Sequence, residues 1–163
     1  MSHDLAAALA SVLHANDVSE VVRLSGGASR ETFRFTADGR PLILQRQRGG
    51  DIRNMGLEAD VLRVARAAGV PVAELVASST DPSVLGAAFM VLSAVDGETI
   101  ARKILRDDEF AEARRLLPGQ LGVALARIHR TDTSTLGGLT SDDQIAMYRT
   151  VLDTSGHPHP TFE

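Results

Sequence analysis

The sequence contains no cysteine and no tryptophan, and only 4% of its residues are aromatic. Without cysteine, neither a disulfide framework nor a thiolate metal site can form. No apolar run approaches the roughly 20 residues that a membrane-spanning helix needs. The N-terminus also lacks the basic start and apolar stretch of a secretory signal peptide. These absences predict a cytoplasmic protein without a membrane among its partners.

Basic residues are outnumbered, since 17 Lys and Arg stand against 21 Asp and Glu, for a formal net charge of −4. Nucleic acid is therefore not expected as a partner, because a protein that neutralises phosphates needs a basic surface. Hydrophobic residues make up 44% of the chain, which is enough for a folded, largely aliphatic core. At 163 residues the chain fits one ordinary domain, or a small lobe plus part of another.

The first half of the chain has the pattern of an antiparallel sheet. Apolar residues at helical spacing from Leu5 to Leu13 predict a first helix. Runs rich in β-forming residues predict five strands, over residues 21–24, 32–36, 42–46, 75–78 and 88–92. Asp38 and Gly39 indicate a hairpin turn, and an apolar face over residues 53–68 indicates a helix after the third strand. The predicted fold class is α+β, with a five-stranded, mainly antiparallel sheet and one inserted helix.

The second half of the chain is expected to be helical. Residues 93–98 are polar or small, which indicates a linker. Helical patterns follow over residues 99–105, 110–117, 120–129 and 142–152. Pro118 either kinks one helix or separates two.

The predicted division is a lobe over residues 1–95 and a linker with an incomplete helical lobe over residues 96–163. In the second part, Leu121, Leu125 and Ile128 share one helix face. The residues present would leave this apolar stripe uncovered. Self-association through it is therefore expected, because contiguous apolar patches are rare on monomers.

A turn of small residues lies between the first two strands, from Ser25 to Ser29. Gly26 and Gly27 have no side chain, so backbone N–H groups there can approach phosphate oxygens closely. The same residues also fit a plain hairpin turn, because turns of small residues are common. Neither a complete G-x-G-x-x-G motif nor a P-loop motif is present. Two interpretations stay open, a phosphate site and a structural turn.

A cation and a carboxylate follow this turn in an order that suits phosphate binding. Arg46 ends the third strand, and Glu58 lies in the first half of the next helix. In kinase-like active sites a strand cation binds the α- and β-phosphates and is oriented by a helix glutamate. Arg46 and Glu58 are the candidates for these roles and are predicted to form an ion pair. The alternative is that both are solvated surface charges.

The segment from Phe89 to Gly97 joins the fifth strand to the linker, and its backbone groups suit the edge of an adenine ring. The alternative is a linker that binds no ligand. His129, near a helix end, fits a packed or capping residue. His157 and His159 lack the carboxylates or thiols that would complete a metal site. No metal-binding residue is predicted.

These residues together resemble the aminoglycoside phosphotransferase family, which has the protein-kinase-like fold. The resemblance covers nearly the whole chain. It is carried by LSGGASRETF at residues 24–33, LILQR at 42–46, LEADVL at 57–62, GVPV at 69–72, FMVL at 89–92 and VDG at 95–97. LARIH at residues 125–129 is similar to a helix of the family's large lobe.

The resemblance implies ATP-dependent transfer of a phosphoryl group to a hydroxyl of a small-molecule acceptor, with Mg²⁺ in the full-length parent. The implied nucleotide contacts are the phosphate cover Ser25, Gly26, Gly27 and Ser29, the pair Arg46 and Glu58, and the adenine-facing Ser93 and Val95. One departure concerns the third strand. The family usually has a basic residue where Gln45 stands and another after it, so the pattern leaves open whether position 45 or 46 faces the phosphates.

A second departure concerns catalysis. The family's catalytic Asp lies in an HGD-type motif, and His129 and Asp132 have the wrong spacing for it. No catalytic residue is therefore assigned, and the chain is expected to end before the catalytic loop and to be inactive by itself. The alternatives are a non-catalytic module that binds a nucleotide or a partner, and a small structural domain with an accidental likeness.

Overall fold

The computed structural model describes residues 2–24, 30–51, 53–139 and 142–156. Its centre is a five-stranded sheet in the order β1-β2-β3-β5-β4, with every neighbouring pair antiparallel. The strands are β1 (Val18–Leu24), β2 (Arg30–Ala37), β3 (Arg40–Gln47), β4 (Leu75–Ser79) and β5 (Phe89–Ser93). The predicted α+β class, the five strands and their antiparallel pairing are confirmed.

The predicted hairpin between β2 and β3 is also confirmed. The two strands pair without interruption from Arg30 opposite Gln47 to Ala37 opposite Arg40. Asp38 and Gly39 form the turn with φ values of 46° and 78°. Left-handed φ at both central positions is what a type I′ turn requires, and its twist matches that of the two strands.

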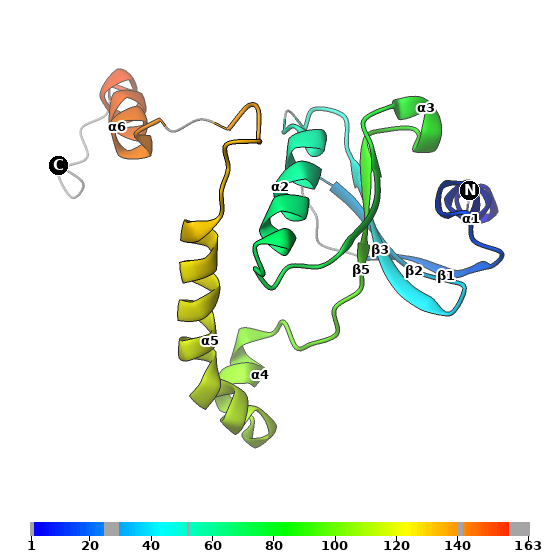
Figure 1. Ribbon diagram of the computed structural model, residues 1–163, viewed down its shortest axis with the longest axis horizontal. Helices are drawn as coiled ribbons and strands as arrows, with labels where there is room; N and C mark the ends of the chain where they lie inside the picture. The colour runs from blue at the N-terminus through cyan, green and yellow to red at the C-terminus, as the bar shows by residue number, and fades with distance from the viewer. Residues whose placement is uncertain (1, 25–29, 52, 140–141, 157–163) are drawn as a thin grey trace.

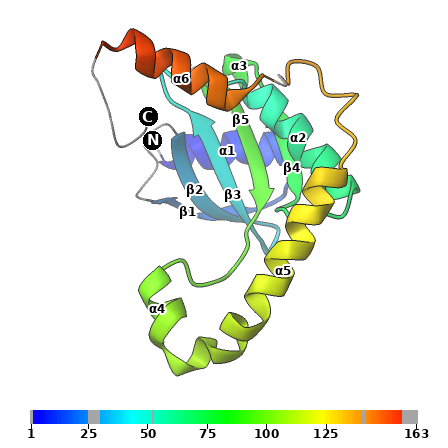
Figure 2. The ribbon, with the colours of Figure 1, turned by 90° about the vertical axis from the view of Figure 1, so that its left-hand side faces the viewer.

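The two faces of the sheet carry different helices (Figures 1 and 2). Helix α1 (Ser2–Leu13) covers the outer face, where Leu9 is buried against Leu42 and Leu44 of β3. Helix α2 (Met55–Ala67) covers the inner face, where its residues Met55 and Ala59 are buried against the β5 residue Met90. Because side chains alternate along a strand, Leu42 and Leu44 fix which residues of β3 point outward.

Local signals set the ends of α2, which was predicted over residues 53–68. The side chain of Asn54 caps the helix by accepting a hydrogen bond from the Leu57 N–H at 3.1 Å. Gly69 follows the helix with a φ of 77°, in the left-handed region that favours glycine. The short helix α3 (Pro82–Leu85) was not predicted and replaces part of the expected loop between β4 and β5.

Helices follow the sheet in the second half of the chain (Figure 1). They are α4 (Ala101–Arg106), the 3₁₀ turn η1 (Asp108–Phe110), α5 (Ala111–Arg130) and α6 (Gln144–Thr154). Helix α5 continues through Pro118, so the helical patterns over 110–117 and 120–129 belong to one helix, and of the two alternatives left open at Pro118 the separation into two helices is wrong. The guanidinium of Arg127 in α5 donates to the Gly69 carbonyl at 2.7 Å and thereby ties α5 to the end of α2.

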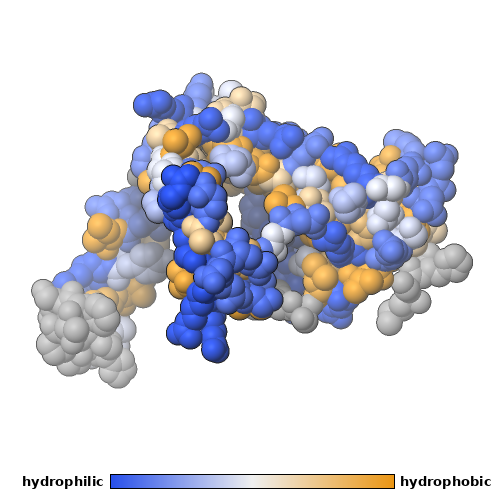
Figure 3. Space-filling view, turned by 90° about the horizontal axis from the view of Figure 1, so that it is seen from below, coloured by the Kyte–Doolittle hydropathy of each residue, from blue (hydrophilic) through white to orange (hydrophobic). Residues whose placement is uncertain are grey.

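Apolar side chains are exposed along these helices. Leu121, Leu125 and Ile128 are 59%, 53% and 52% exposed, and the described part of α4 to α6 contains no buried residue. A view from below shows hydrophobic residues among hydrophilic ones on the surface (Figure 3). None of the helices within the described ranges is both long and apolar enough to cross a membrane. The division into domains at residues 95 and 96 stays a prediction.

Candidate functional site

The inner face of the sheet is only partly covered by a helix. Helix α2 packs against β4 and β5, while β1 lies at the other edge of the sheet. Val22 and Leu24 of β1 are 57% and 40% exposed, and they pair with Arg34 and Thr32 of β2. Gln45 alternates with the outward-pointing Leu44 and so points to the inner face. Thr32 lies directly opposite Gln45, and directly opposite residues share a face, so Thr32 and its β1 partner Leu24 also point to the inner face, as do Arg34 and Val22 two residues away. The open half of this face therefore presents apolar surface to solvent.

A charged cluster lies on the same face, where the sheet meets α2. Arg30, at the start of β2, donates from Nη1 to Oε1 of Gln45 at 3.0 Å. Its Nη2 donates to Oε1 of Glu58 from α2. The Nε of Arg30 lies 3.9 Å from a carboxylate oxygen of Asp51, which is itself paired with Arg53. Glu58 thus has a strand cation as its partner, but that cation comes from the second strand.

The predicted ion pair between Arg46 and Glu58 is wrong. Arg46 has the same parity as Leu42 and Leu44, so its side chain points to the outer face. There its Nε donates to Oε2 of Glu31 at 3.0 Å, and its Nη1 donates to the Leu85 carbonyl at 3.0 Å. The sheet therefore lies between Arg46 and Glu58, and Gln45 is the inward residue of the pair.

Glu31 joins two arginines on the outer face. It accepts hydrogen bonds from Arg46 and forms an ion pair with Arg23 at 3.1 Å. The bonded Arg46 guanidinium, helped by the charge of Arg23, holds the pKa of Glu31 below its ordinary value against the opposing effect of burial. These residues line a cavity of about 610 Å³ beside α1. Because its charged groups satisfy one another, this cluster fits a structural role.

The end of β5 and the connection after it, which begins at Ala94, are hydrogen-bonded to the segment before β4 and to β3. Ser93 accepts a hydrogen bond at Oγ from the Glu74 N–H at 2.9 Å, and the Ala94 N–H donates to the Pro41 carbonyl at 3.1 Å. Val95 is 75% exposed. The side chain of Ser93 is thus engaged within the protein, whereas Val95 is open to a ligand.

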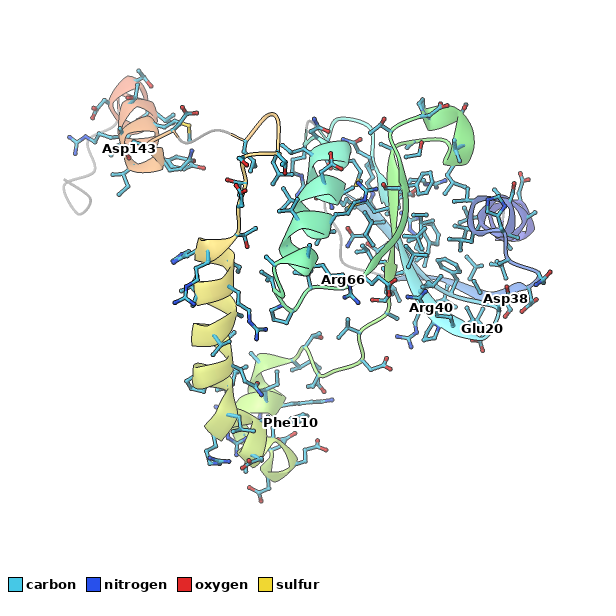
Figure 4. The ribbon with its side chains drawn as sticks, viewed as in Figure 1. Glu20, Asp38, Arg40, Arg66, Phe110 and Asp143 are labelled. Carbon is cyan, nitrogen blue, oxygen red and sulfur yellow. The ribbon has the colours of Figure 1, made fainter. Side chains whose placement is uncertain are left out.

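Ion pairs surround this connection. Asp96 pairs with Arg34 of β2 at 3.2 Å. Glu74 pairs with Arg40 at 2.7 Å and lies 3.9 Å from Arg66. Figure 4 shows Arg40 and Arg66 at the end of the sheet from which the chain leaves for the helices. Side chains from β2, β3 and α2 therefore fix the geometry at this end of the sheet.

Comparison with known proteins decides the family. A family model described as the phosphotransferase enzyme family (APH) matches residues 20–154, which is most of the chain. The chain belongs to this phosphotransferase family. No curated protein matches the sequence.

Solved structures share the fold of this phosphotransferase-family chain. One is from Ralstonia eutropha JMP134 and is classed with the aminoglycoside phosphotransferases; it is 22% identical, with a TM-score of 0.70 over 94% of this chain and 48% of its own. Aminoglycoside phosphotransferase APH(4)-Ia is 19% identical, with a TM-score of 0.54 over 78% of this chain and 40% of its own.

A thermostable mutant of APH(4)-Ia, in a ternary complex with ADP and hygromycin B, is likewise 19% identical, with a TM-score of 0.53 over 76% of this chain and 39% of its own. The resemblance to a kinase-like lobe is thus confirmed for the fold. The phosphotransferase-family chain spans about half, or less, of the length of these structures.

Sequence reasoning missed Arg30, although a signal for it was present. Alternation along the strand puts residue 46 on the face of Leu42 and Leu44, and residue 45 on the opposite face with Ile43. The hairpin turn at Asp38 and Gly39 then fixes the register of β2 against β3, which brings Arg30 to the inner face. Alternation and register together therefore separate Arg30 and Gln45 from Arg46.

The nucleotide contacts predicted for the turn before β2 remain predictions. Ser25, Gly26, Gly27 and Ser29 lie outside the described residues. Among the residues that the structure does describe, no three His, Asp or Glu side chains are grouped so that they could hold a metal ion. The described residues therefore do not fit a Mg²⁺ site.

Proposed function

We propose that this chain forms the nucleotide-covering part of an ATP-dependent phosphotransferase that acts on a hydroxyl of a small molecule. The supporting observation is the division of the inner face into an open apolar surface at Val22 and Leu24 and a charged cluster at Arg30 and Glu58. A nucleotide has the same division, since its base is a flat apolar ring and its phosphates are anionic. Family membership supports the same ligand.

The base would lie against the exposed side chains of β1. Val22 pairs with Arg34, which pairs with Ile43, so these residues form one row across the inner face. Arg34 is tied to Asp96 in the connection after β5. The base edge would then meet the backbone around Val95, whose side chain is exposed. Burying Val22 and Leu24 under the ring would remove apolar surface from water, which is the main favourable term in such binding.

The phosphates would extend from the base toward Glu58 and the turn before β2. Backbone N–H groups at Gly26 and Gly27 would cover them, because a residue without a side chain allows close approach. APH(4)-Ia has been captured with ADP and hygromycin B together, which supports a nucleotide for the present chain and leaves its own acceptor unspecified.

In the proposed reaction the bond between the γ-phosphorus and the β,γ-bridging oxygen breaks, and a bond to the acceptor oxygen forms. ADP leaves, and the hydroxyl proton passes to a base. The chain spans less than half of the matched structures' length, so we assign that base and the metal ligands to the portion of the family's structure that this chain does not span. The chain alone should bind ATP without turning it over.

Calorimetric titration of the purified chain with ATP and with adenosine tests the proposal. Both ligands should bind, and Val22→Asp should weaken both by at least about tenfold, because a carboxylate would meet the base. Val123→Asp is the matched control, since Val123 is similarly exposed at 53% but lies on α5. Absence of ATP binding by the folded wild-type chain would overturn the proposal. ATP turnover that follows the purified chain would contradict a base outside it.

A further inference from the structure

Arg30 has a buried N–H group without an acceptor. Its side chain is only 13% exposed, and its Nη1 and Nη2 donate to Gln45 and Glu58. Among the described residues, Nε of Arg30 is a buried polar atom with no hydrogen-bond partner. The nearest carboxylate, that of Asp51, lies 3.9 Å away, beyond hydrogen-bond distance. Buried polar groups are nearly always satisfied, so this donor calls for an acceptor.

The charged groups around Arg30 have no net positive charge, but the N–H donors of Arg30 still suit an anion. Asp51 is engaged by Arg53, whose Nε and Nη2 donate to its two oxygens at 3.0 and 3.1 Å. Glu58 is the carboxylate that pairs directly with Arg30. These four groups sum to zero charge, so an anion would be held by directed N–H bonds and not by a general positive field. A guanidinium has five N–H donors and can bind a carboxylate and a phosphate at once.

The neutral residue at position 45 of β3 accounts for the supply of the cation by β2. Gln45 points to the inner face at the place where the third strand would contribute a cation, but its amide is neutral. Its Oε1 instead accepts from Arg30 and holds the guanidinium beside Glu58. Arg46 cannot replace it, because Arg46 lies across the sheet and is bonded to Glu31 and the Leu85 carbonyl.

We propose that Arg30 binds the phosphate chain of the nucleotide, with Gln45 as the positioning residue that takes the place of a third-strand cation. This inference rests on the proposed nucleotide function. It assigns the phosphate contact to the second strand, and it makes Glu58 the partner of Arg30. The buried Nε–H would then have a phosphate oxygen as its acceptor.

The test compares the affinities of ATP and adenosine, since their ratio isolates the contribution of the phosphates. The wild-type chain should bind ATP more tightly than adenosine by about tenfold or more, and Arg30→Gln should remove most of that preference while leaving adenosine affinity unchanged. Arg46→Gln should keep the preference. Arg30→Gln combined with Gln45→Lys moves the cation to the third strand and should restore it.

Each result decides between the two proposals. If the wild-type chain binds neither ligand, the nucleotide function fails. If it prefers ATP and folded Arg30→Gln keeps that preference, the role of Arg30 is refuted while the nucleotide function stands. The role of Arg30 is likewise refuted, and the nucleotide function stands, if Arg46→Gln removes the preference for ATP and Arg30→Gln does not.

A measurement on the wild-type chain covers the case in which the Arg30 variants do not fold. The Nε–H signal of Arg30, followed by NMR, should shift on titration with ATP and stay in place with adenosine. If the chemical shift of the Arg30 Nε–H does not change at saturating ATP, the inference is overturned even though ATP binds.

Discussion

Asp17 and Asp38 exchange hydrogen bonds between the start of β1 and the turn of the β2–β3 hairpin. The Asp17 N–H donates to Oδ1 of Asp38 at 2.9 Å, and the Asp38 N–H donates to the Asp17 carbonyl at 3.0 Å. The Asp38 carboxylate also accepts from the Asn16 N–H at 3.0 Å. Asp38 therefore fixes the hairpin turn against the segment that leads from α1 into β1.

Replacing Gly39 by alanine should destabilise the hairpin by roughly 1–2 kcal/mol, the usual cost of a left-handed residue with a Cβ. The φ of Gly39 is 78°, and nothing lies within 4 Å of an added Cβ, so the cost is conformational and not steric. Gly97→Ala is the control, because Gly97 is equally open but outside the left-handed region. Urea unfolding measures both, and equal effects of the two variants would contradict the type I′ assignment.

Leu44→Ala should lower the free energy of unfolding by about 2–5 kcal/mol, the range for removing a buried leucine. Leu44 is fully buried between the sheet and α1. Leu105→Ala should change it by less than about 0.5 kcal/mol, because Leu105 is largely exposed. Denaturant titration with a folded-state control by circular dichroism separates them. A small effect at Leu44 would mean that α1 does not form the outer layer of the core.

Glu31→Gln should destabilise the chain at neutral pH and lose its effect in acid. The pKa of Glu31 is lowered in the folded state from an ordinary value of 4.5, first by the hydrogen bond from Arg46. A lowered pKa adds stability that is fully present above the unfolded-state pKa and disappears as the pH falls through the folded-state pKa.

The quantity to measure is the difference in unfolding free energy between wild type and Glu31→Gln at a series of pH values. Carboxylates elsewhere cancel in this difference. It should be constant above about pH 5 and should shrink as the pH falls below 4.5. A difference that persists unchanged well below pH 3 would show that the carboxylate charge of Glu31 contributes nothing.

The exposed apolar stripe on α5 should cause concentration-dependent association. Leu121, Leu125 and Ile128 are each more than half exposed. Full burial of an exposed Leu or Ile side chain contributes roughly 1.5–3 kcal/mol of favourable free energy. Leu121→Glu with Leu125→Glu should shift sedimentation velocity profiles toward the monomer, whereas Leu105→Glu should not. A wild-type chain that stays monomeric at all concentrations would contradict this expectation.

The sheet and its inserted helix were predictable because their signals are local. Period-two alternation, the Asp38–Gly39 turn and the apolar face before Gly69 each act within a few residues. Helix α3 was missed although Asp81 caps it and Pro82 begins it, because four residues are too few for a periodic pattern. Helix α5 passes through Pro118, and proline alone did not show whether the helix kinks or ends there.

The charged site was less predictable, since it depends on register. Order along the chain suggested Arg46 as the partner of Glu58, but the faces of the sheet decide the pairing, and a shift of one residue reverses the face. Glu58 meets Arg30, which precedes it by 28 residues, only because β2 and α2 both adjoin the inner face. Order along the sequence cannot supply that juxtaposition without strand pairing.

The bond from Arg127 to the Gly69 carbonyl joins the helical half to the sheet half, and only one of its two ends is a side chain. Any residue at position 69 that preserves the backbone supplies the same acceptor, whereas no substitution at position 127 other than another long donor can keep the contact. Among relatives, position 127 should therefore vary independently of position 69. A search for correlated substitutions would pass over this attachment point between the two halves.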